Sequence, residues 1–304
     1  MHRKIILRLV VFVIFLIGSV GGLIFLSKNE PFPKIGTATS SATASPPPDG
    51  QSSTVKLRPN RLAGEPSPTP TPIPIPAQWG KQVRVPILLY HYIGKNPNPA
   101  DKARDLLSVD PEEFDKQMDY LSQNSFTPIS FDALHAAIKG NGDLPAKPVI
   151  LSFDDGYMDF YFNAYLILKK YGFHSTVFIP TGLMDKSYYL TWAQIKEMDS
   201  SGLVSFQAHS NNHINLASLS HDKLIYQLTE SKNTLQSQLG KPVNFMAYPY
   251  GISDQIVWEA TKKAGYLGAV GTWYGTTQSE GTIFDMPRVK IPGGITVENF
   301  AKRF

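Results

Sequence analysis

Residues 83–304 of this 304-residue chain are predicted to form an α/β domain built on a parallel sheet. Two observations predict this fold class. Short apolar runs rich in β-branched residues alternate with helical segments in a regular order over about 220 residues. Polar residues follow several of the expected strands, at the end where parallel sheets bind ligands. Such alternation is typical either of a sheet closed into a barrel or of a doubly wound sheet.

The expected elements follow one another in order, and several carry their own boundary signals. The first strand, 85–90, is apolar and ends at His91. Pro111 stands in the first turn of the helix expected at 110–124, where a missing N–H breaks no helical hydrogen bond. Gly172 follows the helix expected at 159–171, as is usual where a helix ends in a left-handed residue. The other expected elements are the helices 131–139, 192–199, 220–239 and 254–264, and the strands 149–153, 175–180, 203–208, 243–248, 266–271 and 286–291.

Two adjacent carboxylates stand at the end of the strand 149–153. Pro148 and Gly156 bound this segment, and Asp154 and Asp155 follow the strand directly. Because neighbouring carboxylates repel each other, a divalent cation or a shared proton is needed to hold them together at a buried strand end. The alternative is an ordinary strand-to-helix turn in which one aspartate caps the following helix.

Two histidines follow the strand 203–208. His209 and His213 are four residues apart, and this spacing predicts that both lie on one face of a helical turn, within reach of one metal ion. Neutral imidazoles suit Zn²⁺ and related metals. An incidental pair of histidines is the alternative, but this pair stands at a strand end, as the two aspartates do.

A third stretch, 245–251, runs from a strand into a turn that contains Tyr248, Pro249, Tyr250 and Gly251. These residues suit a core and a turn. At the mouth of a barrel they could instead form a wall that stacks on a sugar ring, with a backbone N–H that stabilises an oxyanion.

Together these stretches resemble, in order and spacing, the first three signature motifs of the polysaccharide deacetylase family, the NodB-like carbohydrate esterases. The resemblance covers about residues 83–290 and implies a distorted (β/α) barrel of about seven strands. It also implies one divalent metal ion, Zn with Co or Ni as alternatives, and metal-assisted hydrolysis of an acetyl group. The matching motifs are Ser152-Phe153-Asp154-Asp155-Gly156, His209-Ser210-Asn211-Asn212-His213 and Tyr248-Pro249-Tyr250-Gly251.

The resemblance also implies a role for individual residues. Asp155, His209 and His213 would bind the metal ion, and Asp154 would act as the general base. The backbone N–H of Tyr250 would stabilise the oxyanion. Each assignment rests on the position in this sequence that matches the family's motif.

The sequence departs from the family's usual pattern in two ways. Ala247 stands where the third motif usually begins with an arginine, and the C-terminal end of the chain lacks the histidine that usually serves as general acid. The strand that ends at His91 resembles instead the permuted branch that de-N-acetylates poly-N-acetylglucosamine, so His91 is the expected general acid. Arg288 is expected to replace the missing arginine by orienting Asp154. A structural histidine and a surface arginine are the respective alternatives.

The sequence therefore predicts a metal-dependent hydrolase that removes N-acetyl groups from an extracellular polysaccharide containing N-acetylglucosamine. Two alternatives stay open: an O-acetyl ester hydrolase acting on a polysaccharide, and a catalytically inert barrel that binds carbohydrate. The chain has no cysteine, which excludes disulfides and thiolate metal sites. Residues 83–304 hold 20 Lys and Arg against 22 Asp and Glu without a basic patch, which argues against nucleic-acid binding.

Residues 1–82 differ in composition from the rest of the chain. Residues 1–27 combine a basic start with eighteen uncharged residues, 9–26, and predict a cytoplasmic stub and an uncleaved transmembrane anchor. A cleaved signal peptide is the alternative. Residues 28–82 are rich in Pro, Ser and Thr and predict a disordered linker. The expected location is the cell membrane, with one membrane span and an extracellular catalytic domain at 83–304; the oligomeric state stays open.

Overall fold

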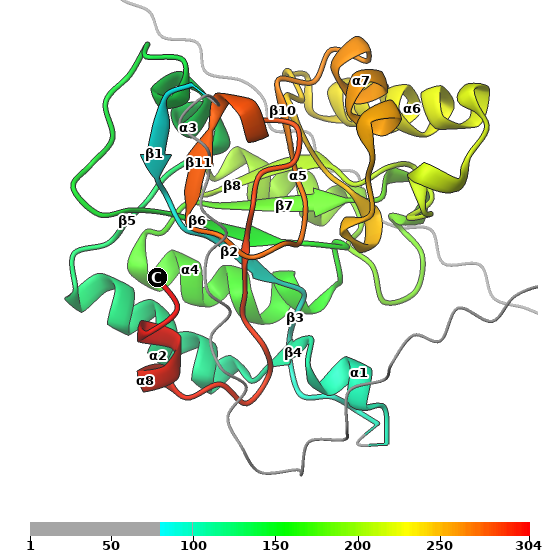
Figure 1. Cartoon of the computed structure of the whole chain (residues 1–304). Coiled ribbons are helices and arrows are strands. Elements are labelled where there is room, and N and C mark those ends of the chain that lie inside the picture. Colours follow the sequence, from blue (N-terminus) through cyan, green and yellow to red (C-terminus); the bar gives the residue numbers. More distant parts are fainter. Residues whose placement is uncertain (1–79, 99) are drawn as a thin grey trace, which may run out of the picture. The chain divides into compact units, whose positions relative to one another are not determined.

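The computed structural model describes residues 80–98 and 100–304. The expected anchor at 1–27 and the expected linker, apart from residues 80–82, lie outside the described residues. No helix within residues 80–98 and 100–304 combines the length and the apolar content needed to cross a membrane. The described residues form a curled parallel sheet with helices packed around it (Figure 1).

An all-parallel sheet lies at the centre of this fold. Its strands run in the order β10-β9-β8-β7-β6-β2-β12, and the short strand β5 pairs with the start of β6. The seven strands of the continuous path agree with the expected number. They are β2 (Ile87–Tyr90), β6 (Pro148–Phe153), β7 (Ser175–Ile179), β8 (Val204–Ala208), β9 (Phe245–Ala247), β10 (Gly268–Val270) and β12 (Val289–Lys290), with β5 at Thr127–Pro128.

The two edges of the sheet approach each other near residue 286. The N–H of Met286 donates to the carbonyl oxygen of Ala269 at 2.9 Å, and the carbonyl oxygen of Met286 accepts from Gly271 N–H at 3.0 Å. These bonds link the segment before β12 to β10, whereas β12 itself pairs with β2. The curl of the sheet is therefore consistent with the expected distorted (β/α) barrel.

The expected helices are found with small shifts at their ends. α2 packs against α4 and α8, and α6 packs against α5 and α7 (Figure 1). The helix expected at 159–171 begins with a π-helical turn, Phe160–Ala164, and continues as α4 to Gly172, which is left-handed as predicted. The helices are α1 (Lys102–Asp105), α2 (Pro111–Gln123), α3 (Phe131–Ile138), α4 (Tyr165–Tyr171), α5 (Trp192–Ser200), α6 (His221–Leu239), α7 (Gln255–Lys263) and α8 (Val297–Ala301).

Several short elements were not predicted from the sequence. They have two to five residues, which is too short for a hydrophobic period to show. β1 pairs with β11 in an antiparallel ribbon, and β3 pairs with β4. Besides β5, the missed elements are α1, α8, β1 (Gln82–Arg84), β3 (Tyr92–Ile93), β4 (Ser108–Val109) and β11 (Thr277–Ser279).

Alternate residues of the strands contribute to two different cores. Ile87, Ile150 and Phe178 belong to one buried cluster, which lies on the concave side of the sheet. Their neighbours Leu88 and Leu151 belong to the other cluster, which packs under the helices. Because side chains alternate along a strand, each strand serves both cores, and the residues two apart along it point to the same side.

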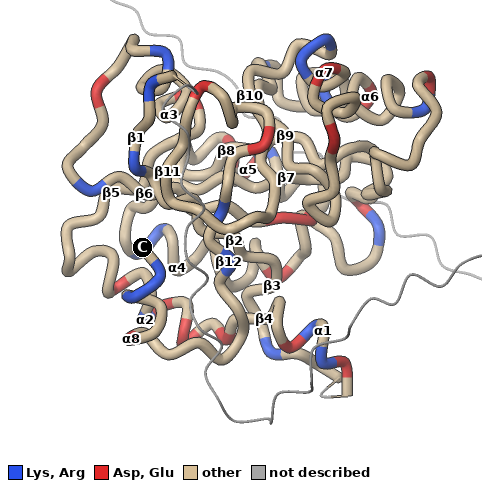
Figure 2. Tube along the Cα trace, viewed as in Figure 1, with Lys and Arg blue, Asp and Glu red and all other residues tan. Residues whose placement is uncertain are grey.

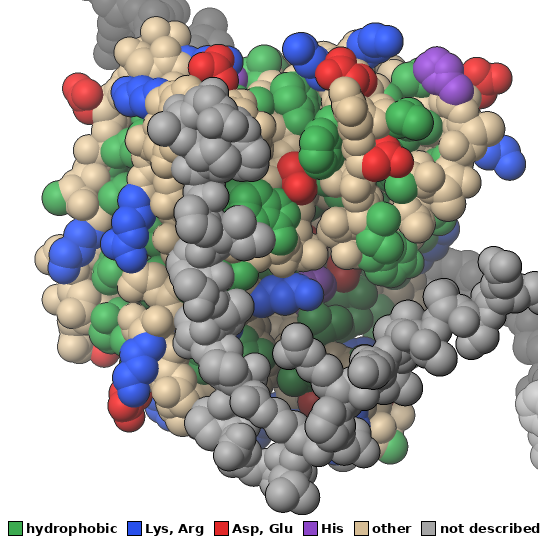
Figure 3. Space-filling model, in the orientation of Figure 1, with side chains coloured by type: hydrophobic (Ala, Val, Ile, Leu, Met, Phe, Trp, Pro, Cys, Tyr) green, Lys and Arg blue, Asp and Glu red, His purple; other side chains and the backbone are tan. Residues whose placement is uncertain are grey.

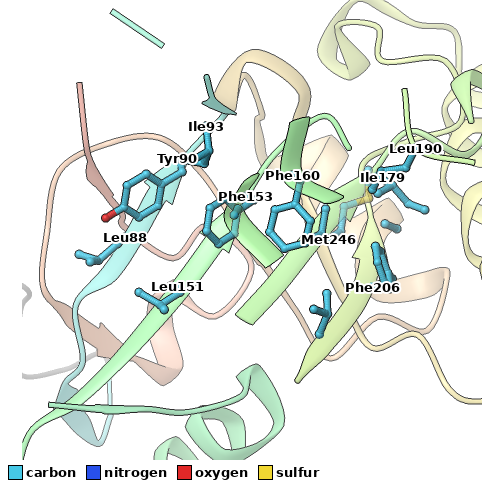
Figure 4. Packing of buried hydrophobic residues seen from close by; sticks show 14 of the residues in the cluster. Leu88, Tyr90, Ile93, Leu151, Phe153, Phe160, Ile179, Leu190, Phe206 and Met246 are labelled. Atoms are coloured by element: carbon cyan, nitrogen blue, oxygen red, sulfur yellow. The ribbon is translucent and has the colours of Figure 1, made fainter. Parts of the chain in front are cut away.

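The core between the sheet and the helices contains several aromatic rings among its aliphatic side chains (Figure 4). The ring of Phe153 stacks on Tyr90 at 5.1 Å and meets Phe160 edge to face at 4.8 Å. The Tyr90 hydroxyl donates to Gln117 Oε1 at 2.8 Å, which pairs these two buried oxygen atoms. This packing fixes the C-terminal ends of β2 and β6, where His91 and Asp154 follow.

Candidate active site

Buried charge is concentrated at one end of the sheet. Lys and Arg are interspersed with Asp and Glu along the described chain (Figure 2), and the face in Figure 3 mixes charged with hydrophobic side chains. Among the residues that the structure describes, the Asp, Glu, Lys, Arg and His side chains that are buried are Asp154, Asp155, His209 and Arg288. Buried charges require partners, so this cluster is the leading candidate for a functional site.

Strand parity explains why Asp154, His91 and His209 meet. Ser152 and Asp154 continue the concave-side series that begins with Ile150 in β6. His91 and His209 follow the last residues of β2 and β8 in the same way. All these strands are parallel, so their C-terminal ends lie at one edge of the sheet.

Asp155, His209 and His213 come together as the sequence predicted. Asp155 Oδ1 lies 3.3 Å from His209 Nε2 and 3.0 Å from His213 Nε2. One ligand atom from each residue lies within 4.8 Å of the other two. Asp155 Oδ1 is buried and takes part in no well-aligned hydrogen bond among the described residues, although both ring nitrogens face it. A divalent cation fits such a convergence of lone pairs.

A hydrogen bond to the backbone fixes the orientation of the His209 ring. His209 Nδ1 lies 2.7 Å from the carbonyl oxygen of Ala247. A carbonyl oxygen only accepts, so Nδ1 carries the proton and Nε2 of the neutral ring presents its lone pair toward Asp155. Burial would raise the pKa of Asp155, but His209 and His213, when they are protonated, donate toward the carboxylate and hold this pKa well below its ordinary value.

The expectation of a helical turn between the two histidines was wrong. Residues 209–215 form a loop, and Ser210 and His213 have φ values of 59° and 52°, in the left-handed region. A hydrogen bond from His213 N–H to Ser210 Oγ at 3.0 Å closes this loop. The two imidazoles therefore meet through a tight loop, with ring centroids 4.8 Å apart, and not through the four-residue spacing of a helix.

Asp154 forms a bidentate ion pair with Arg288. Arg288 Nη1 donates to Asp154 Oδ1 at 2.8 Å and Nη2 to Oδ2 at 2.7 Å. Nε donates to the carbonyl oxygen of Gly271 at 2.8 Å, and Nη1 also reaches Ser152 Oγ at 3.3 Å. Arg288 is fully buried, so the surface-arginine alternative does not hold. Burial raises the pKa of Asp154, but the Arg288 guanidinium, with His209 and His91, brings it below its ordinary value.

His91 lies at the same end of the sheet and lines the same cavity as Asp154 and Asp155. Burial lowers its pKa, and the two carboxylates oppose that shift only in part. A lowered pKa leaves less of the ring protonated at neutral pH, so the expected general-acid role of His91 rests on its position in the cavity and not on this shift.

Tyr250 closes the cavity on the side of His213. Its backbone is left-handed, with φ 61°, in the short turn Pro249–Gly251. The Tyr250 ring lies 4.7 Å from the His213 ring, and its hydroxyl donates to the carbonyl oxygen of His213 at 3.3 Å. The ring is 61% exposed, so it forms part of the rim.

A cavity of about 220 Å³ joins these groups. The sequence did not point to several of its residues, because nothing in their local pattern marks them. Tyr157 is the exception, since it directly follows the Asp154-Asp155-Gly156 motif, and an aromatic residue at that place could have been a signal. The lining residues are His91, Leu107, Asp154, Asp155, Tyr157, His209, His213, Tyr250, Gly251, Thr272 and Lys290.

Residues 141–269 match the polysaccharide deacetylase family. A Bacillus subtilis protein named as a polysaccharide deacetylase, YxkH, is 27% identical over 220 residues, which are 72% of this chain and 76% of that protein. A poly-beta-1,6-N-acetyl-D-glucosamine N-deacetylase of Staphylococcus aureus is 30% identical over 171 residues, 52% of this chain and 59% of that protein. The solved structure of the Streptococcus pyogenes deacetylase PplD in complex with acetate is 32% identical, with a TM-score of 0.69, and the match covers 73% of this chain and 99% of that chain.

These similarities agree with the resemblance seen in the sequence. The matched family region contains both aspartates of the β6 motif, both histidines and Tyr250, whereas His91 and Arg288 lie outside it. The Streptococcus pyogenes protein is matched over almost its full length at more than 30% identity. This chain therefore belongs to the polysaccharide deacetylase family, whose members are hydrolases of polysaccharide acetyl groups.

Proposed function

We propose that this protein is a metal-dependent hydrolase that removes N-acetyl groups from an extracellular polysaccharide containing N-acetylglucosamine. One observation carries the proposal: the Asp155, His209 and His213 ligand atoms converge beside a second carboxylate that Arg288 holds in place. This arrangement gives the two neighbouring aspartates different roles: Asp155 would bind the metal ion, and Asp154 would act as the general base. It also argues against an inert barrel, because a binding module has no need for four buried ionisable side chains at one point.

Asp155, His209 and His213 are the residues that would hold the metal ion, Zn with Co or Ni as alternatives. When bound, such an ion polarises an acetyl carbonyl and lowers the pKa of a water molecule toward about 7. The donor set of two imidazoles and one carboxylate is common for catalytic zinc.

Asp154 is the proposed general base. Arg288 binds both of its oxygens, so the carboxylate is ionised and fixed in one orientation, ready to take a proton from the attacking water. Arg288 is therefore a positioning residue: it contacts Asp154 and lines no part of the described cavity.

His91 is the proposed general acid, and the Tyr250 N–H is the proposed oxyanion donor. As the C–N bond of the acetamide breaks, His91 gives its proton to the departing amine. The Tyr250 N–H donates to the oxygen that gains negative charge. Water and the acetamide thus yield acetate and a free amine on the sugar. The same groups would cleave an O-acetyl ester, whose alcohol leaves with less need for an acid.

The location of the protein is part of the proposal. Residues 1–27 are proposed to anchor the chain in the cell membrane and residues 28–82 to act as a spacer, so that the domain at 83–304 reaches polymers outside the cell. The name of the Staphylococcus aureus relative supports poly-N-acetylglucosamine as a substrate class.

Mass spectrometry of acetyl loss tests the function with the full-length protein reconstituted with Zn²⁺. The substrates are oligomers of β-1,6- and β-1,4-linked N-acetylglucosamine and O-acetylated xylan oligomers. Asp154→Asn should abolish acetate release from the N-acetylated oligomers, whereas Asp222→Asn, at an exposed position in α6, should have no effect. Release from xylan alone would favour the esterase. Binding of glycans without any release would favour the inert barrel.

A further inference from the structure

The short strand that follows His91 is held by a side chain from a distant segment. β3 begins directly after His91 and pairs with β4 through its backbone. On its other side, Asn163 Nδ2 donates to the carbonyl oxygen of Ile93 at 2.6 Å. Asn163 belongs to the π-helical turn Phe160–Ala164, which precedes α4. This bond therefore ties the strand after His91 to the helix that follows the Asp154-Asp155 motif.

The place of Asn163 in this turn calls for a specific contact. Asparagine is disfavoured inside helices because its amide competes for backbone hydrogen bonds. π-Helical turns are rare, and they occur frequently at functional sites. The backbone of Gly94 also lies close to the turn, since a Cβ there would stand 3.4 Å from Asp159 Oδ2 and 3.8 Å from Asn163 Nδ2. The turn and the end of β3 thus fit closely together.

A stacked pair of rings forms a second contact between the same two segments. The Tyr92 ring is stacked on Tyr157 at 3.9 Å and an interplanar angle of 15°. Tyr157 directly follows the Asp154-Asp155-Gly156 motif, and Asn163 comes six residues later. One continuous segment therefore carries the proposed base, one proposed metal ligand and both contacts to β3.

The His91 ring depends on its backbone for its orientation. Among the residues that the structure describes, no hydrogen bond holds this ring, whereas His209 is fixed by the carbonyl oxygen of Ala247. On the N-terminal side of His91, Tyr90 is fully buried in the core. On the C-terminal side, β3 determines the path of the chain. The contacts of β3 thus help to set where the ring lies in the cavity.

We infer that Asn163 is a positioning residue for His91: its bond to Ile93 holds β3, and with it the His91 ring, at a fixed place beside Asp154 and the metal ligands. Asn163 itself lines no part of the cavity that contains His91. A general acid acts only within hydrogen-bonding reach of the leaving group, and a misplacement of about 1 Å can cost about a hundredfold in rate. This inference rests on the proposed function and adds a residue that controls cleavage of the C–N bond from outside the cavity.

The leaving group of the substrate tests the inference. The assay measures kcat and KM of the full-length, Zn²⁺-loaded protein for an N-acetylated glycan oligomer and for 4-nitrophenyl acetate. The amine of the glycan needs a proton to leave, whereas 4-nitrophenolate leaves without one. Asn163→Ala should lower kcat for the glycan by about tenfold to a hundredfold, and should change its KM and the kcat for 4-nitrophenyl acetate by less than about twofold. An equal loss of kcat for both substrates would overturn the inference.

Two further variants accompany this measurement. Asn163→Asp keeps the shape of the side chain but replaces its donor with an acceptor, so it should behave like Asn163→Ala and serves if that variant does not fold. Asn233→Ala, at an exposed position in α6, is the matched control and should change neither rate. Full glycan activity in Asn163→Asp would also overturn the inference.

A double variant shows whether Asn163 acts through His91. His91→Ala should itself lower kcat for the glycan and spare 4-nitrophenyl acetate. Adding Asn163→Ala to His91→Ala should then lower kcat for the glycan by less than about twofold, because the group that Asn163 positions is already absent. Effects that multiply would assign Asn163 a role independent of His91 and would overturn the inference.

Hydrogen exchange separates a failure of this inference from a failure of the proposed function, because it requires no activity. Mass spectrometry measures amide exchange in the full-length protein with and without Asn163→Ala. Exchange in residues 92–94 should become about tenfold faster, and exchange in residues 209–213 should stay unchanged. Faster exchange in 92–94 supports the hold on β3 even if the wild-type protein releases no acetate from any glycan. Unchanged exchange there overturns the inference, whatever the catalytic activity.

Discussion

Replacing Arg288 with glutamine tests the structural centre of the site. Arg288 is fully buried and Asp154 is 3% exposed, so neither charge has water as an alternative partner. Arg288→Gln removes both bonds to the carboxylate and leaves a buried anion without its counter-charge. Breaking a buried pair in this way costs about 3–5 kcal/mol of folding free energy. The guanidinium also donates to the carbonyl oxygen of Gly271, and the variant loses that bond as well.

A double-mutant cycle in urea isolates the pair. The free energy of unfolding is measured at pH 7 for the wild type, Arg288→Gln, Asp154→Asn and the double variant. Each single variant leaves one buried charge unpaired, whereas the double variant leaves none. The effects should therefore fall short of additivity by about 3 kcal/mol. Arg84→Gln, at an exposed position, serves as the matched control.

The pH dependence of stability tests whether Arg288 stabilises the ionised form of Asp154. In the wild type, the depressed pKa of Asp154 stabilises the fold above the unfolded pKa, and this contribution is lost as the pH falls through the folded pKa. Without Arg288, burial dominates and raises this pKa, so Arg288→Gln should recover stability relative to the wild type as the pH falls from 7 toward 4. The acidic limb of kcat/KM should move to higher pH. Additive effects within about 0.5 kcal/mol, or a stability difference that does not change with pH, would refute this reasoning.

Three further predictions use other parts of the described chain. Burial raises the pKa of Asp159 to about 6 from an ordinary value of 3.8, so Asp159→Asn should be more stable than the wild type by up to about 3 kcal/mol at pH 8. In urea titrations, the stability gained by Asp159→Asn should vanish toward pH 4. A gain that does not depend on pH would contradict its origin in the raised pKa of Asp159. Removal of metal with a chelator should abolish acetate release and lower Tm, and His213→Ala should lower the metal content measured by mass spectrometry; full activity without metal would exclude the proposed site. Gly251→Ala should destabilise the fold by about 2–4 kcal/mol, because its Cβ would overlap the side chain of Thr272, whereas Gly240→Ala, with a similar φ and open space, should cost about 1 kcal/mol.

The strand ends were predictable because their signals are local. Val149, Ile150 and Leu151 mark a buried strand, and the two aspartates follow it within the same short segment. The parallel order of the sheet then brings His209 to the same edge without any further information. The positions of these residues could therefore be predicted from periodicity and from the ends of strands.

Contacts between distant segments could not be predicted with the same success. The loop between His209 and His213 depends on two left-handed residues that are not glycine, and the spacing alone favoured a helical turn. The stacking of Tyr92 on Tyr157 depends on how β3 leaves the sheet, and β3 has only two residues. Such features are fixed by tertiary packing, which overrides local preference.

The position of Arg288 shows how a different strand can supply the arginine that pairs with Asp154. β2 is an early strand in the chain, yet it pairs with β6 on one side and with β12, near the C-terminus, on the other. The segment that enters β12 also bonds to β10, so Arg288 stands where the two edges of the curled sheet meet and its side chain lies in the concave core beside Asp154. A carboxylate there requires a buried cation within hydrogen-bonding distance, but it does not specify which strand supplies it. At position 247, the usual place of that arginine, the chain supplies a backbone carbonyl that orients His209, and the charge comes from Arg288, which directly precedes the edge strand β12.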